Sequence, residues 1–505
     1  MRSKRMLVLA ALILSQALIL QLCAQNALTA KAKQPLYRLV DMGTFGGPVS
    51  IVFGGTGNLN QMTTLATSCA DTADLDPDWP NINPAFGNDP YIQHAFITRS
   101  GRLRDLGTLS GGTSSCGQGV NTRGVVAGFS TNGAIDPLTG FPEIEPVLWR
   151  NGKILDLGNF GGNGGYANFL NDRDQVVGGA LNSIPDPFSS VLSVYGATQI
   201  HAFLWEDGAM EDLGTLGGPD SFAYYINERG EIAGQSFTNS VPNDTTGIPT
   251  MHPFLWSLGR MHDLGTLGGT IATPSFLNNR GQVAGTSNLA GDQASHPFFW
   301  DDGVMQDLGT FGGNNGEVQW MNDQGATVGR AYFPGDTRWD AFLWQDGKMT
   351  DLGNLGCTSS GLGINSKRQV VGTSRLADCA TVHGWLWQDG KMYDLNDLIT
   401  PGANLELVEP LYINDDGVID GRGLPPGCND VHVCGHAFLL FPCDGDDLRK
   451  CVNRLQVTTA DTNLSVSPVP ASSVPVNNPQ PDRIQTSRNP LTQRGGFYQR
   501  GSRVD

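Results

Sequence analysis

Residues 201–218 read His-Ala-Phe-Leu-Trp-Glu-Asp-Gly-Ala-Met-Glu-Asp-Leu-Gly-Thr-Leu-Gly-Gly, and Asn227-Glu-Arg-Gly230 follows after a short gap. The Asp of the Asp-Leu-Gly element recurs at positions 41, 105, 156, 212, 263, 307, 351 and 394. The Asn of the second element recurs at positions 60, 121, 171, 227, 278, 322, 365 and 414. A repeat of this period indicates an array of one supersecondary unit, so the fold follows from the repeat rather than from the 505-residue length.

Each copy contains four strand-like segments separated by turn-forming residues. The Asp-Gly pair at 207–208 is expected to form a two-residue hairpin turn, and the Asn-x-x-Gly element at 227–230 a second turn. With the first turn in that place, Trp205 pairs with Met210 and Phe203 pairs with Asp212. The many glycines, 66 in all, and the low charged fraction of 16% also suit short strands joined by tight turns.

The two ends of the repeat region complement each other. The repeats begin with a lone strand over residues 37–43, and the last copy stops after the strand at 436–441. The sequence therefore predicts an all-β protein, a β-propeller of eight blades with four antiparallel strands each, closed by the N-terminal strand pairing into the last blade. The alternatives are a seven-bladed ring and a linear β-solenoid. A solenoid would explain the repeats but not the complementary ends.

The repeat resembles the HAF repeat of predicted bacterial extracellular proteins. The resemblance rests on His-Ala-Phe-Leu-Trp followed by Asp-Leu-Gly-Thr-Leu-Gly-Gly, and it extends over residues 37–441. It implies an exported protein and supplies no catalytic residues. Two copies depart from the pattern, because Glu145 and Asp340 replace the His, and Cys357 stands where a second Gly is expected.

The chain divides into three regions. Residues 1–30 are expected to be a signal peptide, because basic residues precede an apolar run from Met6 to Leu22; an uncleaved membrane anchor is the alternative. Residues 35–445 form the repeat region. Residues 446–505, rich in Pro, Ser and Asn, are predicted to be a disordered tail. The expected location is secreted or cell-surface, extracellular or periplasmic.

The formal net charge of −17 argues against a nucleic-acid partner, because an acidic surface repels phosphates. A glycan or a surface protein is compatible with it, no membrane contact is expected beyond the signal or anchor segment, and the chain is expected to be monomeric. The even number of cysteines after Cys23 favours disulfides in an oxidising compartment. Proximity in the sequence suggests the pairs 428–434, 443–451 and 357–379, which leaves 69 with 116.

Six of the eight histidines share one repeat position, at residues 94, 201, 252, 296, 383 and 436. A diagonal hydrogen bond to the repeated Asp is expected, and a catalytic dyad repeated around a ring has no evident use. We therefore assign these pairs a structural role and expect no catalytic residues among them. The best copies of the pair are His201 with Asp212, His252 with Asp263, and His296 with Asp307.

Inserts in a repeat scaffold are where function is expected to lie. Long segments between the Asn turn and the next His strand span about residues 70–93, 131–144, 181–200 and 236–250, all on one face of the ring. The aromatic candidates for ligand binding are Trp79, Tyr332, Phe333 and Trp339. The candidate calcium ligands are Asp71, Asp74, Asp76 and Asp78, calcium being the one cofactor considered. The alternative is that these segments are solvated loops with both tryptophans packed down.

Three functions compete at this point. The first is an exported, non-catalytic scaffold that binds a glycan or a surface protein through its insert-bearing face. The second is a carbohydrate-active enzyme, which needs two facing acids outside the repeat register. The acids available for it are Glu143, Glu145, Asp186, Asp244 and Asp336. The third is a structural or adhesive surface protein.

Overall fold

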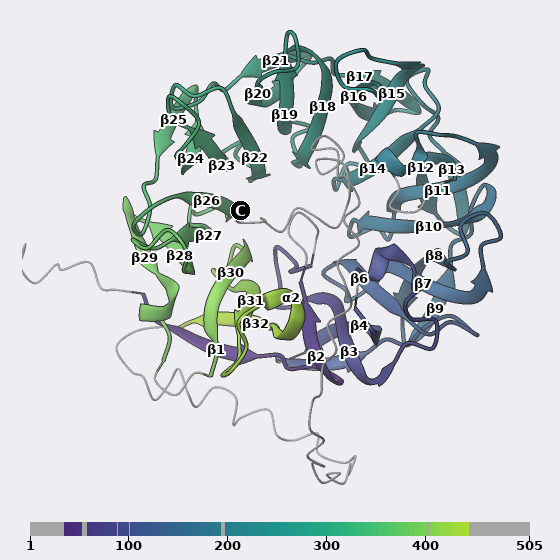
Figure 1. Ribbon diagram of the computed structural model, residues 1–505, viewed down its shortest axis with the longest axis horizontal. Coiled ribbons are helices and arrows are strands. Elements are labelled where there is room, and N and C mark those ends of the chain that lie inside the picture. The colour runs from purple at the N-terminus through teal and green to yellow at the C-terminus, as the bar shows by residue number, and fades with distance from the viewer. Residues whose placement is uncertain are drawn as a thin grey trace, which may run out of the picture.

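The computed structural model describes residues 35–52, 58–87, 89–99, 101–192, 197–400 and 404–443. The expected signal peptide and the C-terminal tail lie outside these residues. Within them the chain is almost entirely β-structure, arranged as a propeller-like ring of sheets around a central axis (Figure 1). No helix among the described residues has the length and hydropathy needed to cross a membrane.

The strands form eight four-stranded antiparallel units, which follow one another around the ring. Unit 1 consists of β2(Gly46–Ile51), β3(Thr67–Leu75), β4(Tyr91–Arg99) and β5(Arg102–Asp105), and unit 2 of β6(Ser115–Val120), β7(Val126–Ile135), β8(Pro142–Arg150) and β9(Lys153–Asp156). Unit 3 consists of β10(Gly161–Leu170), β11(Val176–Pro185), β12(Thr198–Glu206) and β13(Ala209–Asp212), and unit 4 of β14(Ser221–Ile226), β15(Ile232–Pro242), β16(Pro249–Ser257) and β17(Arg260–Asp263).

Units 5 to 8 have the same order of strands. Unit 5 consists of β18(Gly268–Leu277), β19(Val283–Leu289), β20(Ser295–Asp301) and β21(Val304–Asp307), and unit 6 of β22(Gly316–Met321), β23(Thr327–Tyr332), β24(Trp339–Gln345) and β25(Lys348–Asp351). Unit 7 consists of β26(Ser359–Ile364), β27(Val370–Arg375), β28(Val382–Gln388) and β29(Lys391–Asp394), and unit 8 of β30(Glu406–Ile413), β31(Ile419–Leu424), β32(His436–Pro442) and β1(Tyr37–Asp41). Short helices lie at η1(Pro84–Phe86), η2(Ser189–Val191), η3(Leu395–Asp397) and α2(Val431–Cys434).

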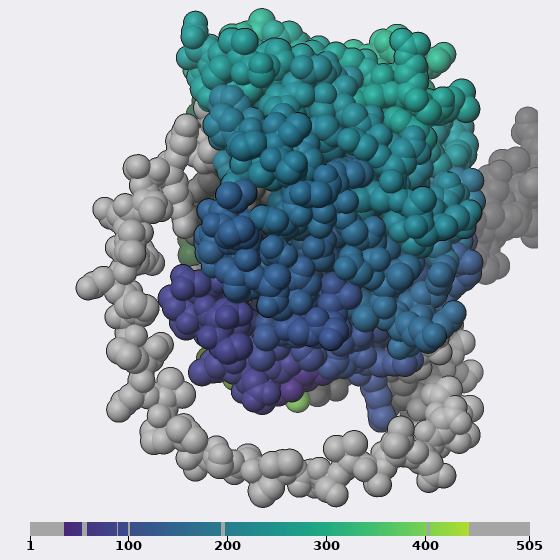
Figure 2. Space-filling view, turned by 90° about the vertical axis from the view of Figure 1, so that its right-hand side faces the viewer, coloured from purple at the N-terminus to yellow at the C-terminus, as the bar shows by residue number. Residues whose placement is uncertain are grey.

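Units 4 and 5 share one eight-stranded sheet, because Met251 on β16 bridges to Ile271 on β18. The other units are separate sheets whose faces pack against each other. The first strand of each unit lies nearest the axis and the fourth lies at the rim (Figure 1). Viewed from the side, the units follow in sequence order up the wall of the ring (Figure 2).

The predicted pairing within the repeat is confirmed. Trp205 pairs with Met210 and Phe203 pairs with Asp212 in the hairpin of β12 and β13. Asp207 and Gly208 have φ values of 51° and 88°, the left-handed conformation that a tight two-residue hairpin requires. The N-terminal strand β1 pairs antiparallel with β32, so it completes the last unit as the complementary ends indicate.

The repeated Asn forms a belt that links all eight units. Its side-chain oxygen accepts N–H groups of its own turn, from residues two and four positions later, as in Asn322 with Gln324 and Ala326. Its side-chain amide donates to a carbonyl of the next unit, in most cases that of the next repeated Asn, as in Asn322 Nδ2 to Asn365 O at 2.9 Å. Asn414 of the last unit donates to Thr63 O of the first at 2.8 Å. We call the eight residues at positions 60, 121, 171, 227, 278, 322, 365 and 414 the asparagine belt.

Aromatic side chains from five of the units contact one another in a chain next to the belt. They come from the residue two positions before the repeated Asn, where the innermost strands carry an irregularity in register. Trp320 lies 4.2 Å from Phe276 and 5.0 Å from Tyr412, measured between ring centroids. The last contact joins units 6 and 8, and Gly363 of unit 7 makes room for it because a Cβ there would lie 3.0 Å from Tyr412 Cα. We call Phe169, Tyr225, Phe276, Trp320 and Tyr412 the aromatic plug.

We predict that Asn322 stabilises the protein through its bond to the next unit as well as through the bonds within its own turn. A substitution that removes only the first bond should reveal this. Asn322→Asp keeps the oxygen that accepts from the turn but places a second acceptor against the Asn365 carbonyl. We expect it to lower the free energy of unfolding by about 2 kcal/mol or more, close to the effect of Asn322→Ala. Thermal and denaturant unfolding measure this.

The control is Asp323→Asn in the same turn, which keeps the oxygen that accepts from the Asn279 N–H and loses only the exposed bond from the Asn279 side-chain amide, so it should cost about 1 kcal/mol or less. If Asn322→Asp is as stable as the unchanged protein, the inter-unit bond contributes nothing.

Candidate functional site

The repeated His and Asp are hydrogen-bonded in six units, with the geometry that the sequence predicts. In unit 3 the His201 Nδ1 lies 2.8 Å from a carboxylate oxygen of Asp212, whose other oxygen accepts the Gly214 N–H. Burial raises the pKa of Asp212, but the bonds from His201 and Gly214 outweigh it, and the pKa lies below its usual value. The same bond joins the pairs 94–105, 252–263, 296–307, 383–394 and 436–41. These pairs fix the Gly-rich loop that leads into the next unit, which supports a structural role.

In the two copies that have an acid in place of the repeated His, a second residue also differs from the repeat and bonds to that acid. Glu145 replaces the His in unit 2, and there Asn159 stands where the best copies have the Thr of Asp-Leu-Gly-Thr; its amide donates to Glu145 at 3.1 Å. Asp340 replaces the His in unit 6, and Asn354 at the Thr position donates to it at 2.8 Å. Burial raises the pKa of Glu145 to about 7 against the opposing effect of the Asn159 bond. Each acid thus receives a donor from the Asn at the Thr position, and Asp340 also forms an ion pair with Arg338.

We predict that this compensation appears as a double-mutant coupling. Glu145→His alone and Asn159→Thr alone should each destabilise the protein, because each leaves a polar group without its partner. The double variant restores the combination found in other units, with Asp156 available to the introduced imidazole ring, and should cost about 1 kcal/mol less than the sum of the singles. Unfolding free energies of the four proteins measure the coupling, and strict additivity would contradict it.

The four long inserts are β-hairpins at their base, and the segments between the two strands of each, such as residues 76–87 and 136–141, are loops. Strands β3, β7, β11 and β15 continue past the other units' strand ends, and the strand after each one pairs back along it, as Leu75 does with Tyr91 and Ile135 with Pro142. Beneath them lies a layer of aromatic contacts, for example Tyr166 with Phe222 at 4.9 Å. The sequence does not predict these strands, because Asn, Asp and Pro, which are depleted in strands, are frequent in them. Units 1 to 4 therefore extend further on this face and end in a long hairpin, which we call a tall hairpin, whereas units 5 to 7 end in short loops.

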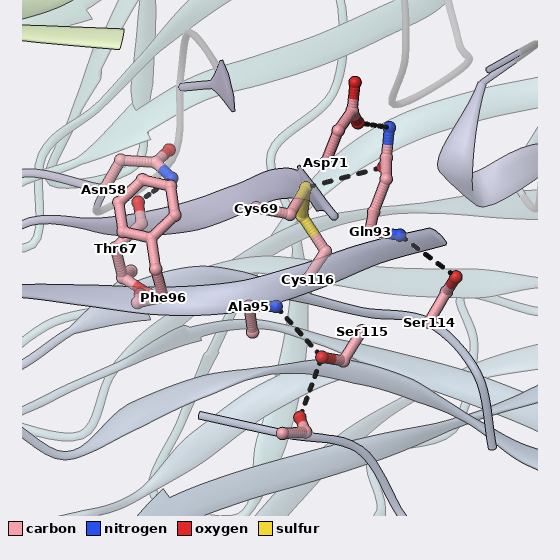
Figure 3. The surroundings of a disulfide bond; sticks show 11 residues. Asn58, Thr67, Cys69, Asp71, Gln93, Ala95, Phe96, Ser114, Ser115 and Cys116 are labelled. Carbon is pink, nitrogen blue, oxygen red and sulfur yellow. Dashed lines mark hydrogen bonds between the residues drawn. A yellow bond between two sulfur atoms is a disulfide. The ribbon is translucent and has the colours of Figure 1, made fainter. Parts of the chain in front are cut away.

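The structure does not bring the four candidate calcium ligands together. Asp71 is fully buried in β3, where it accepts the Val49 N–H at 2.9 Å and the Gln93 amide at 3.3 Å, beside the Cys69–Cys116 disulfide (Figure 3). Burial, together with the charge of Asp89, raises its pKa to about 8. Asp76 accepts from Ser114 of the next unit at 3.2 Å. No group of three or more His, Cys, Asp or Glu in the described ranges is placed to hold a metal ion, and calcium binding stays a prediction.

A buried acid pair lies under the third tall hairpin. Asp220 is fully buried, its Oδ1 accepts the Ile200 N–H at 2.9 Å, and its Oδ2 has no donor among the described residues. Burial, followed by the neighbouring Asp186, raises the pKa of Asp220 to about 8. Asp220 therefore holds a proton at neutral pH, and its hydroxyl can donate to the Asp186 carboxylate.

We predict that this pair makes the protein lose stability as the pH rises. A carboxyl with a raised folded-state pKa contributes its full stability below its unfolded pKa, and that contribution disappears as the pH rises toward about 8. Asp220→Asn keeps the acceptor oxygen and has no proton to lose. It should be more stable than the unchanged protein at pH 9, by on the order of a few kcal/mol, and little different at pH 4.

Asp212→Asn gives the matched control, since the pKa of Asp212 is lowered and the sign reverses. It should destabilise the protein at pH 7 and matter less as the pH falls below the carboxyl's usual range. Melting temperatures between pH 4 and pH 9 measure both variants. An unchanged pH profile for Asp220→Asn would contradict the protonated state.

The structure separates the four aromatic candidates. Trp79 belongs to the tall hairpin of unit 1 and is 39% exposed. Tyr332 and Trp339 belong to unit 6 and contact each other, with ring centroids 5.2 Å apart. Phe333 stacks instead on Phe311 at 5.0 Å. Only the pair of Tyr332 and Trp339, within this set, shares one site.

Trp339 lines a recess between units 6 and 7, on the same face as the tall hairpins. The recess is shallow, and most of its space of about 280 Å³ is open to solvent at its mouth. The lining residues are Arg330, Trp339, Thr358, Ser359, Ser360, Thr373, Arg375 and Val382. We call this site the Trp339 recess. It combines an aromatic ring, two guanidinium groups and several hydroxyls, which is the chemistry of a polar ligand site.

Both arginines of the recess lie over the tryptophan. The guanidinium carbon of Arg330 is 5.7 Å from the Trp339 ring centroid, and that of Arg375 is 5.9 Å away. Arg330 also pairs with Glu317 at 2.8 Å. Reasoning from the sequence missed both arginines. The available signal was that Arg330 interrupts, and Arg375 ends, a strand of otherwise apolar, small and hydroxyl-bearing residues.

A disulfide forms beside the recess and confirms one suggested pair. Cys357, at the position of Gly313 in the preceding unit, is bonded to Cys379. A Cβ at Gly313 would point at the Asp336 side chain, which lies in the loop equivalent to that of Cys379. The pairs 69–116 and 428–434 are also present. Cys443 is disulfide-bonded as well, and its suggested partner Cys451 lies outside the described residues.

Comparisons with known proteins leave the family open. No family model matches the chain, and no curated protein does. Among solved structures it is similar to TolB from Acinetobacter baumannii, with 12% identity, a TM-score of 0.31 and coverage of 55% of this chain and 65% of that one. It is also similar to dipeptidyl peptidase 4 from Porphyromonas gingivalis, with 11% identity, a TM-score of 0.43 and coverage of 72% and 56%. The matched region thus spans less than two thirds of either protein, and the likeness carries no functional argument.

Proposed function

We propose that this protein is an exported, non-catalytic repeat scaffold that binds a saccharide at the Trp339 recess. One observation carries the proposal: a partly exposed tryptophan, backed by Tyr332, lies in a recess rimmed by hydroxyl and guanidinium groups. Aromatic rings pack against the apolar faces of sugar rings, while the polar groups at the rim can bond the sugar hydroxyls.

The scaffold is proposed to be a closed propeller of eight blades, each blade being one unit. The pairing of β1 with β32 and the asparagine belt support closure, since hydrogen bonds join each unit to the next and the last to the first. In such a ring the aromatic plug closes the axis at the belt end. A ligand then approaches from the insert-bearing face, where the recess lies.

The disulfides support an oxidising location, secreted, cell-surface or periplasmic. Three bonds lie within the described residues, and two of them join segments that are far apart in sequence, Cys69 with Cys116 and Cys357 with Cys379. Disulfides of this kind persist outside the reducing cytosol. This agrees with the signal peptide expected at residues 1–30.

The enzyme hypothesis lacks a pair of facing acids with free carboxylates among the described residues. Glu143 accepts from Asn132 at 3.1 Å, Glu145 accepts from Asn159 at 3.1 Å, and Asp336 accepts from Asn314 at 2.8 Å, while Asp186 lies beside the buried Asp220. Four of the five candidate acids thus have a structural neighbour. The binding scaffold therefore fits the described residues better than a glycosidase does.

We predict that Trp339→Ala abolishes binding to insoluble polysaccharides. The unchanged protein should be depleted from solution by at least one member of a panel, and the loss of the aromatic surface should cost about 1 to 3 kcal/mol, enough to reduce depletion roughly tenfold or more. Pull-down with and without a calcium chelator measures this, and the chelator also tests the calcium prediction for the acids of unit 1.

Trp79→Ala is the matched control, because it removes an exposed tryptophan from a tall hairpin in another unit. It should leave depletion unchanged. Normal depletion of Trp339→Ala, or no depletion of the unchanged protein by any polysaccharide, would overturn the proposal.

A further inference from the structure

We infer that the Trp339 recess selects saccharides that carry a carboxylate, such as uronic acids, and that Arg375 is the residue that recognises it. The inference rests on the proposed function, because it names the ligand class of the same site. It is carried by the charge of the recess, by the geometry of Arg375, and by a comparison of the repeat units with one another.

The recess is cationic although the chain is strongly acidic. The formal net charge of the chain is −17, yet the ionisable residues that line the recess are two arginines. Glu317 neutralises Arg330 through an ion pair of 2.8 Å. Arg375 has no ion pair among the described residues, and its buried Nε has no hydrogen-bond acceptor there. A buried guanidinium N–H without an acceptor is unfavourable, and an anionic ligand would supply the acceptor.

The internal repeat shows that a cation next to an open recess is particular to this place. The position of Arg330, directly after the Gly of the second strand, is held by Phe129 in unit 2 and by Gln235 in unit 4, beneath the tall hairpins. In unit 8 it is Arg422, which forms an ion pair with Glu409 and is covered, since both side chains are 6% exposed. Units 6 and 7 combine cationic residues with a short loop, so their guanidinium groups border an opening.

The backbone around Arg375 is fixed before any ligand arrives. Arg375 is the last residue of β27, and its N–H donates to Thr358 O at 2.9 Å while its carbonyl accepts the Cys357 N–H at 3.1 Å. The Cys357–Cys379 disulfide joins the segments on either side of this residue. Holding a binding residue in place lowers the entropy lost on binding.

The hydroxyl groups of the recess complete the match to an acidic sugar. Ser360 and Thr373 are paired across β26 and β27, and Thr358 precedes them at the rim. A hydroxyl can donate to a carboxylate or bond a sugar hydroxyl. The guanidinium fork of Arg375 provides the charge-assisted bonds, and Trp339 provides the surface for the ring.

The test compares sugars that differ only at carbon 6. Isothermal titration of the full secreted chain is made with galactose and galacturonate, and with glucose and glucuronate. We expect the acidic member of at least one pair to bind about tenfold or more tightly, a preference that weakens with added salt. Arg375→Gln should abolish the preference while leaving the affinity for the neutral sugar, and Arg375→Lys should retain part of it.

Arg368→Gln is the matched control. It makes the same change of charge in the same unit, but in the Asn turn at the opposite face, and it should leave the preference intact. Melting temperatures establish that each variant is folded. Equal binding of neutral and acidic sugars, or a preference that survives in folded Arg375→Gln, would overturn this inference alone. Binding of neither class, together with no depletion by any polysaccharide, would overturn the proposed function.

Discussion

The asparagine belt is the constraint on which the rest of the structure depends. Each belt residue uses its oxygen to close its own turn and its amide to hold the next unit, so one side chain couples local and tertiary structure. Separate sheets that meet only through apolar faces could slide past one another. A buried amide has a strict bonding direction, and leaving it unpaired costs on the order of 1 to 3 kcal/mol, so eight such bonds fix the angle between neighbours. The direction of the innermost strands, and hence the position of the plug, follows from that angle.

Because the chain contains eight copies of the repeat, a residue that differs in one copy can be compared with the same position in the other seven. The Thr of the Gly-rich loop becomes Asn where the His becomes an acid, because Glu145 and Asp340 accept hydrogen bonds that a His ring would have formed differently. A Gly becomes Cys357 where the facing loop offers Cys379. These exchanges keep the loop in place while changing its chemistry. In each case the new side chain has a bonding partner in the neighbouring loop.

The repeat period, the turns and the complementary ends were sufficient to predict the units, their register and the pairing of β1 with β32. The belt was not predicted, because a single copy shows only the local bonds of its Asn. A hint was available: the Asn is present in all eight copies, whereas the Gly three positions later is replaced by Thr63, Asp174 and Arg368. A residue needed only for the turn would be expected to vary as the Gly does.

The candidate site was predicted in part for a related reason. Tyr332 and Trp339 stood out as aromatic residues in a short insert, but one of their arginine neighbours, Arg375, comes from β27 of the next unit. Contacts between units depend on how far each sheet is rotated about the axis, which a linear pattern does not encode. Trp79 was grouped with them on residue type alone, and its place in unit 1 separates it from them.

The pairing of β1 with β32 sets the order in which the molecule can be completed. Asp41 and His436 are in contact although 395 positions separate them in the chain. Strand β1 therefore stays unpaired until translation has reached β32, a delay on the order of half a minute at ordinary synthesis rates. An unpaired strand edge is a template for aggregation, so the earliest segment to be made protects the latest one. The residues around Tyr37 thus protect the last unit, and cleavage that reached them would leave the edge of β32 unpaired.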